Sequence, residues 1–151
     1  MRHKLTKLHV LYGTETGNAQ DVAERIFSDC KRRCFAVTIK SFDEIMELQA
    51  ITTAGHIIIA VCSTTGQGEE PSNMKKFWRF LLRRNLPEDM FRDVGVAVLG
   101  LGDSSYIKFN FAAKKLSRRL LQLGAYDFVP IGLADDQHDL GKAKDHNGLS
   151  F

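Results

Sequence analysis

The sequence predicts an α/β domain built on a parallel, doubly wound sheet. Five short apolar runs typical of strands alternate with amphipathic runs typical of helices. In the run at residues 56–62 every residue after His56 is apolar, as in strands that are buried on both faces of a parallel sheet. At 151 residues the chain is long enough for one domain with a single buried core. In sheets of this kind the connections are right-handed, and ligands bind beyond the carboxyl ends of the strands.

Each element is predicted from its own pattern of apolar residues. The expected strands are residues 5–12, 35–39, 56–62, 94–99 and 128–131. A helix over 18–33 places Val22, Ala23, Ile26 and Cys30 on one face, and a short helical piece is expected around 43–48. The next helix has Pro71 in its first turn and an apolar face made by Met74, Phe77, Trp78, Leu81 and Leu82. The last helix, over 109–123, is expected to end at Gly124.

Composition and charge restrict the class of protein. The chain is 44% hydrophobic and 26% charged, and it contains no apolar run long enough to cross a membrane. Residues 1–4 lead directly into a strand pattern without a signal-peptide core, so a cytoplasmic location and no membrane partner are expected. Three cysteines argue against a disulfide framework. The net charge of +3 lies in clusters that are interpreted first as solvated helix faces and second as docking patches for partners, and no nucleic-acid partner is expected.

The turn at residues 12–19 joins the first expected strand to the first expected helix. Thr14, Thr16 and Asn18 bring side-chain donors to a helix N-terminus, where free backbone N–H groups and the positive dipole end favour an anion. The turn contains no lysine, which excludes a P-loop for a nucleoside triphosphate. The turn by itself supports two interpretations equally: an ordinary helix cap, or a binding site for one terminal phosphate.

Three other strand ends carry unusual residues. Residues 63–71 and 100–110 are rich in glycine and hydroxyl groups, and residues 134–138 are acidic. Because carboxyl ends of parallel strands meet at one edge, these segments are expected to share a ligand with the first turn. A phospho-acceptor receiver domain would need acidic residues where Gly13, Thr14, Ser63 and Thr64 stand, so that class is excluded.

In combination these segments resemble a known family. The stretches LYGTETGNAQDVAERI, STTGQGEEPSNMKKFWRFLLRRNLP and VLGLGDSSYIKFNFAAKKLSRRLLQLGA are similar to the FMN-binding, flavodoxin-like domain of NADPH-dependent diflavin reductases. Within that family the chain looks most like the reductase of cytosolic iron–sulfur protein assembly. The resemblance runs from about residue 5 to residue 141, and it implies a five-stranded sheet in the order 2-1-3-4-5.

The resemblance also implies a set of FMN-binding residues. The phosphate would be held by Thr14, Glu15, Thr16, Gly17, Asn18 and Ala19. One side of the flavin would be lined by Ser63, Thr64, Thr65 and Gly66, and the other by Leu101, Gly102, Asp103, Ser104, Ser105, Tyr106, Ile107, Lys108, Phe109 and Asn110. Tyr106 would stack on the ring, and Asp135 and Asp136 would lie near the edge of the site. Thr65 stands where many diflavin reductases have a second aromatic residue, so one-sided stacking is expected.

Two departures from the family concern the end of the chain. Residues 1–141 are expected to form the domain, and residues 142–151 a divergent disordered tail in place of the closing C-terminal helix. Part of the sheet face formed by the last two strands is then expected to be exposed. The sequence also lacks the FAD- and NADPH-binding modules of a diflavin reductase.

The implied function is one-electron transfer, with no catalytic side chain and no metal site. FMN would receive electrons from the FAD/NADPH-binding reductase module and pass them to an anamorsin-type iron–sulfur protein. The alternative is a truncated form that acts as a non-catalytic interaction domain with weak or no FMN binding.

Overall fold

In residues 6–64, 68–102 and 110–135, which the computed structural model describes, six parallel strands form one sheet. The strands are β1 (Lys7–Gly13), β2 (Ala36–Ser41), β3 (Ile57–Ser63), β4 (Gly95–Gly102), β5 (Tyr126–Asp127) and β6 (Gly132–Asp135). Their order is β2-β1-β3-β4-β5, and β6 pairs with β4 beyond the end of β5. The predicted class and the predicted order 2-1-3-4-5 are confirmed.

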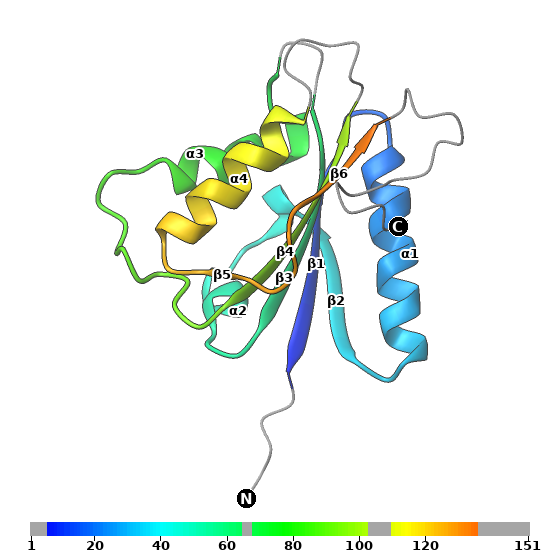
Figure 1. The fold of residues 1–151 in the computed structure, drawn as a ribbon, viewed down its shortest axis with the longest axis horizontal. Coiled ribbons are helices and arrows are strands. Elements are labelled where there is room, and N and C mark those ends of the chain that lie inside the picture. Colours follow the sequence, from blue (N-terminus) through cyan, green and yellow to red (C-terminus); the bar gives the residue numbers. More distant parts are fainter. Residues whose placement is uncertain (1–5, 65–67, 103–109, 136–151) are drawn as a thin grey trace, which may run out of the picture.

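Helices cover the two faces of the sheet unequally (Figure 1). The helix α1 (Asn18–Arg32) lies on one face, and α3 (Lys75–Leu81) and α4 (Phe111–Gln122) lie on the other. The short α2 (Gln49–Thr52) and the 3-10 turns η1 (Phe42–Glu44) and η2 (Ser72–Met74) complete the connections. The alternation along β1 matches this arrangement, because Val10 packs with α1 whereas Leu11 joins the larger core beneath α3 and α4.

The larger core is built from side chains of β1, β3, β4, the two covering helices and the segments that connect them. Its fully buried members include Phe42, Met74, Leu81, Phe91 and Leu116. Of the residues predicted for the apolar face of α3, Met74, Phe77 and Leu81 are buried and Trp78 is half-buried. Leu82 is the exception, because it follows the last turn of α3 and is 53% exposed.

Two predicted strands differ from those observed. The strand expected over 128–131 is a break between β5 and β6, where Phe128 donates one more hydrogen bond to Val96 and Pro130 has no N–H to continue the ladder. The strand expected to end at residue 99 continues to Gly102, so Gly100, Leu101 and Gly102 belong to β4 and not to a loop.

The face of the sheet beside β5 carries exposed apolar side chains. Tyr126 is 48% exposed, Phe128 is 55% exposed and Val129 is 42% exposed. The exposure expected on the sheet face of the last two strands depends on the predicted absence of the closing helix, and the strand β4 itself is mostly buried. The predicted absence of a closing helix and the predicted tail concern residues outside the described ranges, and they remain predictions.

Candidate functional site

The carboxyl ends of four strands meet at one edge of the sheet, at the top in Figure 1. The register aligns Gly13 of β1 with Cys62 of β3, and Ser63 with Leu101 of β4. Gly102 is in turn aligned with Asp135 of β6. The segments that the sequence predicted to share a ligand therefore lie along the same edge.

The turn between β1 and α1 is held by its own side chains. The Gly17 N–H donates to Thr14 Oγ1 at 2.8 Å, and Gly17 has a φ of 97°, a left-handed conformation that favours glycine. The Gly17 carbonyl accepts the first helical hydrogen bond, from the Asp21 N–H at 2.9 Å. Ala19 is buried, whereas Thr16 and Asn18 are exposed. The turn thus leaves Thr16 and Asn18 exposed beside the free N–H groups of the first helical turn.

A second segment, η2, braces this turn. The Thr14 N–H donates to Asn73 Oδ1 at 2.9 Å, and the Ser72 N–H donates to Glu15 Oε1 at 2.6 Å. The acidic group of Glu15 is therefore engaged by η2, which reduces its repulsion of an anion at the helix N-terminus. Ser72 and Asn73 were absent from the predicted site. Their position directly after Pro71 could have identified them in the sequence, because Ser and Asn at the start of a helix commonly form hydrogen bonds with backbone groups.

The end of β3 and the strand β6 are joined to the start of α4. Thr64 Oγ1 accepts the Ala112 N–H at 3.1 Å, and the Asn110 side chain donates from Nδ2 to the Ala134 carbonyl at 3.1 Å. Asn110 is fully buried in a left-handed conformation, and its Oδ1 atom has no hydrogen-bond partner within the described part of the chain. Because a buried acceptor without a donor is costly, this atom fits a site completed by another group.

Gly100 allows this close approach. A Cβ atom built there would lie 2.6 Å from Ala113 Cβ and 2.9 Å from Asn110 Oδ1. The sequence predicts Gly100 in a loop that shares a ligand, whereas Gly100 lies in β4, where its lack of a side chain lets α4 pack directly onto the strand.

The structure places only part of the predicted FMN site. Thr14, Glu15, Thr16, Gly17, Asn18, Ala19, Ser63, Thr64, Leu101, Gly102 and Asn110 lie at the strand-end edge, as does the backbone of Asp135. The remaining predicted residues fall outside the described ranges: Thr65, Gly66, Asp103, Ser104, Ser105, Tyr106, Ile107, Lys108, Phe109 and Asp136.

The side chains at the described edge are better suited to binding a phosphate than to acid, base or thiol catalysis. Its donors are hydroxyl, amide and helix N-terminal groups, and no three His, Cys, Asp or Glu side chains gather as metal ligands anywhere in the described ranges. Cys62 is completely buried behind it, and this burial raises the pKa of its thiol to about 12. A thiol in that state is not a nucleophile.

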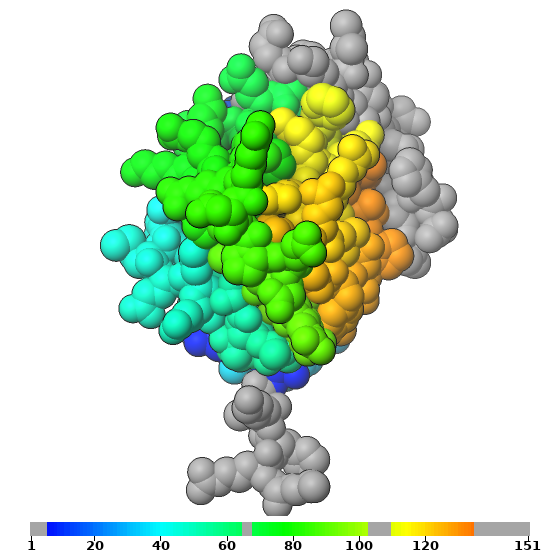
Figure 2. All heavy atoms as spheres, turned by 90° about the vertical axis from the view of Figure 1, so that its left-hand side faces the viewer, coloured from blue at the N-terminus to red at the C-terminus, as the bar shows by residue number. Residues whose placement is uncertain are grey.

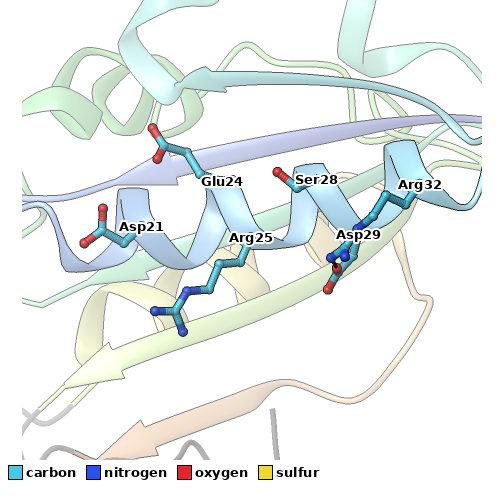
Figure 3. A pocket seen from close by; sticks show the side chains of 6 residues that line it. All are labelled: Asp21, Glu24, Arg25, Ser28, Asp29 and Arg32. Atoms are coloured by element: carbon cyan, nitrogen blue, oxygen red, sulfur yellow. Dashed lines mark hydrogen bonds and ion pairs between the residues drawn. The ribbon is translucent and has the colours of Figure 1, made fainter.

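A hollow elsewhere on the surface lacks the features of a ligand site that this edge has. This hollow, of about 520 Å³ (Figure 3), runs along the outer side of α1 and is lined by Asp21, Glu24, Arg25, Ser28, Asp29 and Arg32. The described residues that line it come from α1 alone, and they include both acidic and basic side chains. This composition marks a solvated helix face and not a ligand site.

The turn hydroxyl gives a direct test of the local geometry. Replacing Thr14 with Val removes the acceptor of the Gly17 N–H while keeping the side-chain shape, so we expect a loss of about 1 kcal/mol in the free energy of unfolding. Urea denaturation measures this loss. Thr16→Val, which changes an exposed hydroxyl of the same turn, is the control; equal losses in the two variants would contradict this role of Thr14.

Comparison with known proteins adds three findings. A family model described as "Flavodoxin" matches residues 10–146. The chain is 57% identical over 132 residues to the NADPH-dependent diflavin oxidoreductase 1 of Danio rerio, a match that covers 87% of this chain and 22% of that protein. The protein of the same name from Arabidopsis thaliana is 48% identical over 141 residues, covering 93% of this chain and 22% of the relative. The chain thus spans about a fifth of the length of these relatives.

Solved structures give the same fold. A flavodoxin mutant from Pseudomonas aeruginosa aligns with a TM-score of 0.76 at 26% identity, covering 89% of this chain and 87% of that one. An oxidised flavodoxin from Bacillus cereus aligns with a TM-score of 0.72 at 20% identity, covering 86% and 84%. The second likeness supports the fold alone.

Proposed function

Because this chain belongs to the flavodoxin family, we propose that it binds FMN and serves as the one-electron transfer domain of a diflavin oxidoreductase. The observation that carries this proposal is the edge where the Thr14–Gly17 turn, the N-terminus of α1 and the ends of β3 and β4 come together. When bound, FMN supplies chemistry that no side chain can, because it takes up and releases electrons one at a time.

The described residues fit the phosphate of FMN. In this proposal Thr16, Asn18 and the first N–H groups of α1 hold the phosphate, and Thr14 fixes the shape of the turn. Ser63 and Thr64 border the ring on one side, and Leu101 and Asn110 on the other. The lining by Thr65, Gly66 and residues 103–109, and the position of Asp135 and Asp136 at the edge of the site, belong to the same proposal.

The wider role rests on the relatives. Their name, NADPH-dependent diflavin oxidoreductase, indicates NADPH and two flavins, and the matched segment is about a fifth of their length. We therefore propose that a separate module binds FAD and NADPH and reduces this domain. By the family resemblance, we propose an anamorsin-type iron–sulfur protein as the acceptor, and iron–sulfur cluster assembly in the cytoplasm as the setting. No helix within the described ranges is long and apolar enough to span a bilayer.

The binding of FMN and riboflavin separates this proposal from a non-catalytic interaction domain. The two ligands share the ring and differ in the phosphate, so a cradle at the N-terminus of α1 should favour FMN by about a hundredfold or more. Quenching of flavin fluorescence during titration of the flavin-free chain measures both affinities. Equal affinities would contradict the phosphate site, and no binding of either flavin would favour the interaction domain.

Tyr106 is the proposed stacking residue, and its truncation should weaken FMN binding strongly. Loss of an aromatic face removes both buried area and the stacking contribution, so Tyr106→Ala is expected to lower affinity about tenfold to a hundredfold. The same titration measures this change. Tyr106→Phe keeps the ring and should bind nearly as tightly as the unmodified chain; an equally large loss in both variants would mean that the hydroxyl, and not stacking, holds the flavin.

A further inference from the structure

The face of the domain formed by α3 and α4 has an unusual charge distribution. Residues 73–86 and 111–122 contain nine Lys and Arg residues and no Asp or Glu. The whole chain carries +3, so the remainder of the sequence carries −6. Figure 2 shows the two helices side by side on one face, α3 in green and α4 in yellow. Charge is therefore concentrated on this face and is not spread over the molecule.

Most of these side chains are exposed. We call them the α3–α4 basic surface and define it by its seven exposed residues: Lys75, Lys76, Arg79, Arg83, Arg84, Lys114 and Arg118. On α4 the exposed positions Phe111, Lys114, Arg118 and Leu121 recur at helical spacing, so they form one stripe along the helix. Within the surface, Lys75 pairs with Glu69 at 3.7 Å.

The other two cations hold the surface in shape. Arg119 donates from Nε to the Leu81 carbonyl at 2.6 Å and from Nη2 to the Arg83 carbonyl at 3.2 Å, which ties α4 to the end of α3. Lys115 pairs with Glu70 and lies over the ring of Trp78, 5.5 Å from its centroid. The two helices are thus fixed relative to each other, and a partner would meet a preformed surface.

Comparison with α1 shows that this distribution is not a general property of the helices. Residues 18–33 contain three acidic and four basic residues, and Arg32 pairs with Asp29 along the hollow of Figure 3. A solvated helix face in this chain is thus balanced in charge. The α3–α4 basic surface instead accumulates charge of one sign, which attracts an oppositely charged partner over a Debye length.

Exposed apolar side chains accompany these charges. Leu82 is 53% exposed, Phe111 is 43% exposed and Leu121 is 38% exposed. Apolar contacts among charged groups are typical of protein interfaces. A long polyanion, such as nucleic acid or an anionic bilayer, would in addition meet the rest of the chain, which carries −6. A short partner can avoid that repulsion.

We propose that the α3–α4 basic surface binds an acidic segment of a partner protein that also carries apolar side chains. Carboxylates of the segment pair with Arg79, Arg83 and Arg118, and its apolar side chains cover Leu82 and Leu121. This interaction goes beyond electron transfer, because it concerns how a partner is held, and it does not require bound flavin.

Charge reversal tests the proposal. The probe is a fluorescein-labelled peptide composed of Glu, Asp and Leu, and its binding to the chain is measured by fluorescence anisotropy. Arg79→Glu with Arg118→Glu should weaken binding about tenfold or more, and raising the salt concentration should weaken binding to the unmodified chain. The milder pair Arg79→Gln with Arg118→Gln should give a smaller loss in the same direction, and circular dichroism checks that every variant is folded.

The matched control makes the same change in net charge on another face. Arg25→Glu with Arg33→Glu alters two exposed residues, one in α1 and one at its end, and should leave affinity nearly unchanged. Equal losses in the two pairs would overturn the proposal in favour of net charge alone. Single-stranded DNA or phosphatidylserine vesicles that displace the peptide at lower concentration would overturn it in favour of a polyanion. Flavin content is recorded for each sample, so a failure of FMN binding is seen separately.

Discussion

Gly100→Ala is expected to lower the free energy of unfolding by about 1–2 kcal/mol, although the change adds only one methyl group. The new Cβ would lie 2.6 Å from Ala113 Cβ, and neither atom is at the end of a flexible side chain. Strand β4 and helix α4 would therefore have to separate, and overpacking of this kind costs about 1–3 kcal/mol. The loss exceeds the stabilisation of about 0.4–1 kcal/mol that an alanine gains by restricting the unfolded chain. Chemical denaturation measures the difference.

The same substitution at the other end of β4 is the matched control. A Cβ at Gly95 would lie 3.0 Å from the hydroxyl oxygen of Tyr126, a side chain that is 48% exposed and has room to move. Gly95→Ala should thus change stability by less than about 1 kcal/mol. Similar losses at both glycines would show that close packing of α4 on β4 is not what requires Gly100.

Mild acid is expected to destabilise the domain through His9. This side chain is 4% exposed and is hydrogen-bonded to Thr38 Oγ1 at 3.2 Å and to His56 Nδ1 at 3.0 Å. Burial, followed by the charges of His56, Lys7 and Lys40, lowers the pKa of His9 from 6.5 to about 4. Between these two values the unfolded chain binds a proton that the folded domain does not, so stability falls as the pH falls. The full loss is about 3 kcal/mol, of which about 2 kcal/mol occurs by about pH 5.

The pH window distinguishes His9 from acidic groups. Hydrogen bonds from Ser41 lower the pKa of Glu44 below its ordinary value of 4.5, so its contribution is lost mainly below about pH 5. Urea denaturation between about pH 7 and about pH 5 therefore isolates the histidine. His9→Leu should abolish the dependence in this window, whereas His56→Gln should retain most of it. A flat profile for the unmodified chain, or a slope that persists in His9→Leu, would contradict the assignment.

The sequence carried enough information to predict the layout of the domain. Alternating strand and helix patterns identified the parallel sheet, and polar segments after three strands predicted the edge where they meet. The same patterns could not predict contacts between residues that are far apart in the sequence. The bond from Thr14 to Asn73 joins residues 59 positions apart, and the contact between His9 and His56 joins residues 47 apart. Neither partner has a local pattern that names the other, because both contacts exist only once the sheet has brought the segments together.

Local backbone effects explain the remaining differences. Pro130 interrupts a run that composition alone makes a strand, and Gly100 looked like a loop residue because glycine is common in turns. A sequence pattern reflects the preference of a residue type for a kind of structure. It does not predict that a particular helix packs closely on the backbone of a particular strand.

The way in which α3 is held has a consequence for the order of folding. This helix has seven residues, too few to persist alone in water. The N–H groups of Lys76 and Phe77 in its first turn donate to Asp43, more than 30 positions earlier in the chain. The carbonyl of its last residue, Leu81, accepts from Arg119, more than 30 positions later. Such a helix becomes stable only after both distant segments have docked, so it forms among the last elements of the domain. An unfinished or partly unfolded chain would lack the ordered cationic face, and a partner that recognises that face would engage only completed molecules.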